Sequence, residues 1–300
     1  MHRTRRALAL AATLAACGAT AQQVRPLTER YAALGTMIVT TSDHAMFPHE
    51  KRAKGHTYEG KAYPADVHYS DKTVAIFVPK GFRPGETTDL VFYFHGWRNN
   101  VDDTLRQFKP AEQLAASGVN AVLVLPEGPK NAPDSFGGRL EETGVFAGLV
   151  ADVLGTLKAR GLVATTKPGA IVLAGHSGAY RVMAFILTRG GLTANVKEVY
   201  LFDALYGQIE KFAHWIDRFP GKLIDIHSAD GGTRAQSLDL MDDLRAWDIP
   251  FVSVPESAVT PDLLKRNRLV FVDSPLAHDD VVAKNGQLRA YLEASSLPRR

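Results

Sequence analysis

The chain has 300 residues, of which 45% are hydrophobic and 22% are charged, and its formal net charge is +3. These proportions are ordinary for a globular enzyme of one or two domains, and they exclude an intrinsically disordered chain. Arg3, Arg5 and Arg6 carry the excess positive charge. Without them the net charge is near zero, so the composition gives no support for nucleic-acid binding.

The first segment, residues 1–21, is typical of a secretory signal peptide. Its arginines precede an apolar run at residues 7–16, and Ala19-Thr20-Ala21 is a small-x-small cleavage site. The apolar run is too short to span a bilayer permanently. The sequence therefore predicts export to the periplasm or the medium.

Cys17 opens a second route for the exported chain. Leu14-Ala15-Ala16-Cys17 resembles the lipobox of bacterial lipoproteins, in which the cysteine is lipidated and becomes the new N-terminus. Cleavage after Ala21 would instead release a soluble protein, which is the outcome we expect. Cys17 is the only cysteine, so it can form no intramolecular disulfide.

Residues 22–72 form a polar, turn-rich segment with one expected strand at residues 37–41. We interpret this segment as a solvated leader or a flap beside the functional site. It contains four histidines whose spacing matches no standard metal-ligand pattern: His44, His49, His56 and His68. We therefore predict no metal site here.

From residue 73 onward, apolar runs alternate with helical patterns. Strands are expected at residues 74–78, 90–94, 121–125, 170–173, 196–202, 223–227, 251–254 and 269–272. Helices are expected at residues 103–116, 140–160, 180–189, 208–218, 234–247 and 281–292, with Pro110 limiting or kinking the first of them. The alternation predicts parallel βαβ units, and continuous apolar strands predict burial on both sheet faces. One doubly wound α/β domain over residues 73–300 accounts for this pattern.

The strand at residues 170–173 leads into Gly-His-Ser-Gly-Ala at residues 175–179, and a helix follows from Tyr180. In this context a G-x-S-x-G-like motif holds its serine, Ser177, at the tip of a strained turn. The positions two before and two after the serine must be small, and here they are Gly175 and Ala179. The motif resembles the nucleophile elbow of the α/β-hydrolase superfamily, and the resemblance extends over residues 74–292.

This resemblance implies an α/β-hydrolase fold, with a mostly parallel sheet between helices, and the machinery of a serine hydrolase. Ser177 would be the nucleophile, and His278, on the loop before the terminal helix, would be its general base. His227 and His214 are weaker candidates, because the first ends an internal strand and the second lies within a helix. His176 adjoins the serine but is expected to point elsewhere.

Two aspartates compete to orient the base. Asp203 ends the strand after the elbow, and Asp230 ends the next strand. The family more often uses the later strand, but Asp203 directly follows an apolar strand, where ligand chemistry gathers in such sheets. Asp230 precedes two glycines and looks more like a turn residue. We therefore place Asp203 first and keep Asp230 as the alternative. The other acids nearby are interpreted as a strand residue and helix caps: Asp225, Asp279 and Asp280.

His95-Gly96-Trp97, at the end of the strand at residues 90–94, resembles the family's oxyanion loop. By this resemblance the backbone N–H groups of Trp97 and Gly178 would bind the developing oxyanion. His95 would support the loop, and Trp97 would also be placed to line an acyl pocket. The next two residues are interpreted as turn residues: Asn99 and Asn100.

The expected function is an exported serine hydrolase that cleaves a carboxylic ester through an acyl-enzyme. Amide cleavage on peptide or cell-wall material, acyl transfer to a sugar or alcohol, and a binding protein without turnover are the alternatives. No P-loop, dinucleotide motif or metal motif is present, so we expect no cofactor, no metal and no nucleic-acid partner. The substrate-binding residues are not indicated by any motif.

Overall fold

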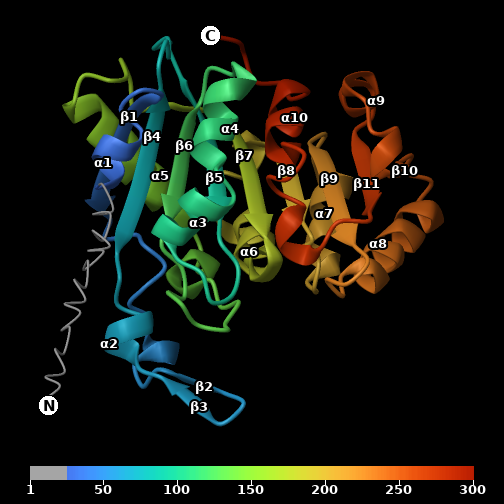
Figure 1. Cartoon of the computed structure of the whole chain (residues 1–300), viewed down its shortest axis with the longest axis horizontal. Coiled ribbons are helices and arrows are strands. Elements are labelled where there is room, and N and C mark those ends of the chain that lie inside the picture. The colour runs from blue at the N-terminus through green and yellow to red at the C-terminus, as the bar shows by residue number, and fades with distance from the viewer. Residues whose placement is uncertain (1–25) are drawn as a thin grey trace, which may run out of the picture.

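The computed structural model describes residues 26–300, so the expected signal peptide and Cys17 lie outside the described residues. Figure 1 shows a central sheet with helices on both faces and a small hairpin that projects from its lower end. The hairpin consists of β2 (His56–Tyr58) and β3 (Lys61–Tyr63). Within the described residues, no helix has both the length and the apolar character needed to cross a bilayer.

The central sheet has nine strands in the order β1-β4-β6-β5-β7-β8-β9-β11-β10. Their bounds are β1 (Gly35–Thr41), β4 (Thr73–Pro79), β5 (Thr88–Phe94), β6 (Val122–Pro126), β7 (Pro168–His176), β8 (Val196–Phe202), β9 (Lys222–Ser228), β10 (Val252–Pro255) and β11 (Leu269–Ser274). Strand β4 pairs antiparallel with β1 and with β6, and all other pairs in this sheet are parallel. The prediction of a mostly parallel, doubly wound sheet is confirmed.

Helices cover both faces of the sheet, so neighbouring residues of one strand enter different cores. On β5, Phe92 packs in the cluster that includes α5, whereas Val91 packs in the cluster that includes α4 and α10. The helices are α1 (Leu27–Arg30), α2 (Ala65–His68), α3 (Val101–Gln107), α4 (Pro110–Ser117), α5 (Val145–Ala159), α6 (Tyr180–Arg189), α7 (Ile209–Arg218), α8 (Arg234–Ala246), α9 (Pro261–Arg266) and α10 (Gln287–Glu293). Burial on both faces explains why the strands are continuously apolar.

Three predicted helices differ from the structure, each because of a residue in the left-handed region. The helix expected at residues 103–116 is two helices, since Lys109 has φ 51° and Pro110 begins α4. The helix expected at residues 140–160 begins only after Gly144, at φ 78°. The helix expected at residues 281–292 begins after Gly286, at φ 69°. Such backbone angles cannot continue an α-helix.

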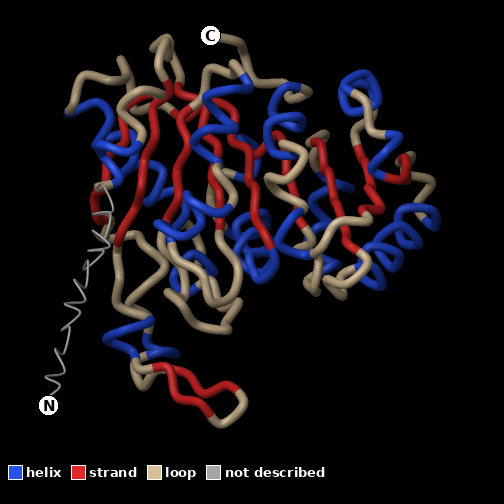
Figure 2. Tube along the Cα trace, in the orientation of Figure 1, coloured by secondary structure: helices blue, strands red, loops and turns tan. Residues whose placement is uncertain are grey.

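The segment at residues 22–72 contributes to the sheet as well as to the surface. Strand β1, expected at residues 37–41, pairs with β4 from Gly35 to Thr41, so the sheet begins before residue 73. The following residues pack on the loop after β6, where Arg52 pairs with Asp134 at 2.7 Å. Figure 2 shows the hairpin below this group of tan loops, beyond the lower end of the sheet.

Candidate active site

Ser177 directly follows β7 and has a left-handed backbone, with φ 56°. A non-glycine residue is strained in this region and is held there by its surroundings. The surroundings are tight, because a Cβ atom on Gly175 would lie 2.6 Å from the Cβ of Ala179. The prediction that both positions must be small is therefore confirmed.

The loop after β5 approaches the same turn through Gly96. A Cβ atom on Gly96 would lie 2.6 Å from the Cβ of Ser177 and 2.8 Å from the carbonyl oxygen of His176. Both distances are shorter than van der Waals contact. Only glycine allows the two loops to lie this close together.

We expect Gly96→Ala to lower the free energy of unfolding by about 1–3 kcal/mol, because the added methyl group must displace backbone on both loops. Chemical denaturation measures this change. Gly85→Ala is the matched control, since the nearest atom to its added Cβ would be 3.5 Å away, at ordinary contact distance. Equal stability of the two variants would contradict this description of the loop contact.

The ring of His278 is hydrogen-bonded to Asp203. Its Nδ1 lies 2.7 Å from Asp203 Oδ2, which leaves Nε2 as the free ring nitrogen. Asp203 follows β8 and is fully buried, and it accepts further hydrogen bonds from the hydroxyls of Ser228 and Thr233. Gly231 lies against this carboxylate, because a Cβ there would be 1.6 Å from Oδ2. Gly231, first interpreted together with Gly232 as a turn signal, thus makes room for Asp203.

These contacts set the charges of the pair. Burial alone would raise the pKa of Asp203, but hydrogen bonds from His278, Ser228 and Thr233 outweigh it and lower that pKa to about 2. Burial would lower the pKa of His278, but the hydrogen bond and charge of Asp203 outweigh it, so that pKa is raised above 6.5. Asp203 is thus ionised at neutral pH and stabilises the protonated imidazole.

The alternative acid, Asp230, contacts the same histidine at a different place. Its Oδ1 accepts a hydrogen bond from the backbone N–H of His278 at 3.1 Å. Asp230 therefore supports the loop and leaves the ring to Asp203. Asp225 lies within β9, fully buried, and burial raises its pKa to about 7.

His176 adjoins Ser177 in sequence, and its ring points toward His278. Its Nε2 lies 2.9 Å from the carbonyl oxygen of His278, and the two rings are 4.4 Å apart. Burial is the main cause that lowers the pKa of His176 to about 3, so this ring is neutral. A neutral imidazole can pack beneath His278 without opposing a positive charge on it.

Gly178 lies against the indole ring of Trp97, the residue predicted to supply the other oxyanion donor. A Cβ on Gly178 would be 2.5 Å from Trp97 Cδ1, and Trp97 Nε1 donates to Ser135 Oγ at 2.7 Å. Within the loops and turns of residues 26–300, the backbone N–H of Trp97 donates no hydrogen bond to another backbone group, so it can serve a ligand oxygen.

His95 lies behind this loop. Its Nδ1 lies 2.8 Å from the carbonyl oxygen of Gly96, and its Nε2 lies 2.9 Å from Glu127 Oε1. His95 is buried and holds the loop, while Glu127 had no signal in the sequence. Asn100 caps α3 by accepting from the N–H of Asp103 at 2.9 Å, whereas Asn99 lines the cavity described next.

Ser177 and His278 line one open cavity of about 990 Å³, together with Trp97 and Gly178. Tyr180 and Tyr206 also line it. The hydroxyl of Tyr206 donates to the carbonyl of Gly231 and lies within hydrogen-bonding reach of the Ser177 hydroxyl. Sequence reasoning missed Tyr206, although it lies only three residues after Asp203.

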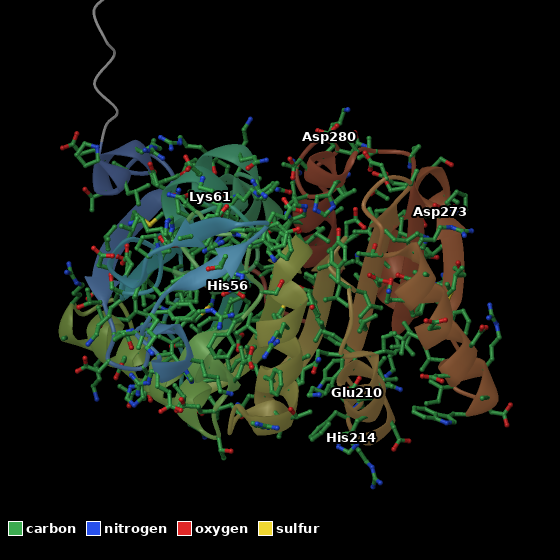
Figure 3. The ribbon with its side chains drawn as sticks, turned by 90° about the horizontal axis from the view of Figure 1, so that it is seen from below. His56, Lys61, Glu210, His214, Asp273 and Asp280 are labelled. Atoms are coloured by element: carbon green, nitrogen blue, oxygen red, sulfur yellow. The ribbon has the colours of Figure 1, made fainter. Side chains whose placement is uncertain are left out.

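The remaining candidates lie elsewhere. Figure 3 shows His214 with Glu210 on α7, and His56 with Lys61 on the hairpin. His227 is buried in β9, with Nε2 3.7 Å from Asp273. Neither Asp279 nor Asp280 caps α10, which begins after Gly286; Asp280 pairs instead with Lys284 at 2.7 Å.

One group within residues 26–300 brings enough donor atoms together to hold a metal ion, namely His176, His278 and Asp279, with ligand atoms within 4.8 Å of one another. Two of its ring nitrogens are already used, since His176 Nε2 bonds the carbonyl of His278 and His278 Nδ1 bonds Asp203. These hydrogen bonds tie both imidazoles and the carboxylate of Asp203 into one network.

No protein-family model matches the chain, and no curated protein matches its sequence. Among solved structures, FphF, a fluorophosphonate-binding serine hydrolase of Staphylococcus aureus, aligns with a TM-score of 0.52 at 10% identity, covering 88% of this chain and 100% of its own. A ferulic acid esterase aligns with a TM-score of 0.51 at 9% identity, covering 74% of this chain and 91% of its own. The chain therefore has the α/β-hydrolase fold.

Proposed function

We propose that this chain of α/β-hydrolase fold is a serine hydrolase that cleaves carboxylic esters. The observation that carries the proposal is the arrangement around one cavity: Ser177 in a strained turn, and His278 bonded to the buried Asp203. A serine hydroxyl is a weak nucleophile until a histidine accepts its proton, and the histidine needs a carboxylate to hold its ring and its charge.

In the proposed mechanism, Ser177 attacks the ester carbonyl while Nε2 of His278 accepts its proton. The backbone N–H groups of Trp97 and Gly178 stabilise the tetrahedral oxyanion. His278 then protonates the departing alcohol, which leaves an acyl-enzyme on Ser177. A water molecule, deprotonated by His278, releases the acid and restores the serine. The proposed chemistry needs no cofactor and no metal.

The first test is labelling of the purified mature chain with a fluorophosphonate probe, followed by a panel of matched esters and amides. We expect labelling at Ser177 and faster turnover of the esters. Faster amide turnover would favour an amidase or peptidase. Transfer of the acyl group to an added alcohol or sugar would indicate an acyltransferase. A folded chain that neither labels nor turns over any substrate would contradict the proposal and favour a binding protein.

The pH dependence of kcat/KM provides a further test. Only neutral His278 can accept the serine proton, so activity should rise with pH through the pKa of His278. Because Asp203 raises that pKa, the midpoint of the acid limb should lie above 6.5. Asp203→Asn removes the charge and should move the midpoint below its position in the parent. An unchanged midpoint would mean that another group titrates.

We also propose that the chain is exported, with residues 1–21 as its signal peptide and Cys17 as the alternative lipid attachment site. Mass spectrometry of the mature N-terminus in a bacterial host distinguishes the routes. A chain that begins at Gln22 supports soluble export, a diacylated Cys17 supports an anchor, and an uncleaved chain contradicts both.

A further inference from the structure

The cavity wall beside Trp97 is rich in hydrogen-bond donors, which come from Arg98, Asn99, Arg106 and Gln107. Part of this wall is already paired. Arg106 bonds Asp103 and lies 3.1 Å from Asp102, and Asn99 Nδ2 donates to Gln107 Oε1 at 3.3 Å. Arg98 differs, because within residues 26–300 its guanidinium makes no ion pair with any carboxylate.

The backbone of Arg98 is held in a strained conformation. It has φ 55°, and its N–H donates to the carbonyl of Ala132 at 2.9 Å. The ionisable group of the hairpin that lies near Arg98 is Tyr58, and the hydroxyl of Tyr58 is hydrogen-bonded to Glu59. A strained non-glycine residue persists where its surroundings hold it, often in a ligand site. Here the strained backbone belongs to Arg98, an exposed residue that lines the cavity next to Trp97, the proposed oxyanion donor.

Two carboxylates line the cavity: Asp103 is bonded to Arg106, whereas Asp279 makes no ion pair with a lysine or arginine within residues 26–300 and lies beside the proposed base. Asp279 lines the same cavity next to His278, and its side chain is 68% exposed. The leaving alcohol must depart toward His278, which protonates it. An anionic group on the alcohol would therefore approach Asp279 and be repelled. An anionic group on the acyl part, a few bonds from the carbonyl, would be attracted to Arg98.

Resting on the serine hydrolase function proposed above, we propose that Arg98 binds a carboxylate carried by the acyl part of the ester. The substrate class is then esters of dicarboxylic acids that keep one free acid group. A guanidinium suits this role because it stays charged at any physiological pH and can donate two parallel hydrogen bonds to a carboxylate.

The test compares two 4-nitrophenyl esters of equal size, the half-ester of adipic acid and its neutral terminal carboxamide. The background of Ser177→Ala is subtracted from every rate. In the parent, kcat/KM should favour the carboxylate ester by about 10-fold, the range of a charge-assisted hydrogen bond. Arg98→Gln should bring this ratio close to one, and Arg98→Lys should leave an intermediate preference. The preference should also weaken at high salt.

Arg160→Gln is the matched control for the lost charge. Arg160 is exposed at the C-terminal end of α5, before β7 begins, and it does not line the cavity. It should keep the preference of the parent. Equal rates for the two esters in the parent, a preference that survives Arg98→Gln, or probe labelling without turnover of either ester would each overturn the proposal. A chain that the fluorophosphonate does not label would instead refute the hydrolase function itself.

Discussion

Ser177→Ala is expected to lower kcat for an activated ester by at least about 10⁴-fold, because the variant can form no acyl-enzyme. The same change should abolish labelling by a fluorophosphonate. Rate enhancement that survives without a nucleophile comes from the oxyanion donors and from binding, so a small residual rate is expected. Steady-state kinetics and labelling on the same preparation measure both effects.

The control for Ser177→Ala is Ser257→Ala, in an exposed serine that does not line the cavity. It should match the parent in rate and labelling. Thermal unfolding of both variants shows whether they are folded, and Ser177→Ala should leave the fold intact because it adds no atom to the tight turn. Full activity of a folded Ser177→Ala would refute the proposed nucleophile.

The second large effect is expected at Asp203. Asp203→Asn should lower kcat by about 10³- to 10⁴-fold, because an amide can donate to His278 and so favour the wrong tautomer. The carboxylate of Asp203 also accepts hydrogen bonds from the hydroxyls of Ser228 and Thr233. A neutral amide at this position would accept them less strongly. Part of the loss will therefore come from local rearrangement. The kinetics should be read beside the stability of the variant.

Asp230→Asn is the matched comparison, since it makes the same chemical change on a residue that touches the backbone of His278 and leaves its ring alone. It should cost no more than about 10-fold in kcat, because a backbone hydrogen bond to an amide oxygen can replace the lost one. A larger loss at Asp230 than at Asp203 would reverse the assignment of the acid.

Much of the fold was predictable because it follows from local periodicity. The apolar runs that became β5, β6, β7 and β8 were recognisable from composition, and their alternation with helical patterns predicted a parallel sheet. The ends of helices were less predictable. Whether Gly144 or Gly286 adopts a left-handed angle depends on how each loop packs, so these glycines gave no clear boundary.

The same division holds at the candidate site. The motif around Ser177 predicted its own tight turn, because steric demand within five residues is a local property. The position of His278 after the last predicted strand also predicted that it lies at the carboxyl ends of the parallel strands, as Ser177 does. The partner of its ring could not be derived in this way, since Asp203 and Asp230 both follow strands that end at that edge.

Only the tertiary structure decided which side chains meet. It brought Asp203 to the ring and Asp230 to the backbone of His278, and it turned His176 under the same loop. Among the described residues it also left Arg98 without an acidic partner. The sequence by itself determined the class of sheet and the strained serine turn, because both arise from short-range periodicity and sterics. Contacts between loops far apart in the chain depend on how the strands are ordered in the sheet, and no local pattern encodes that order.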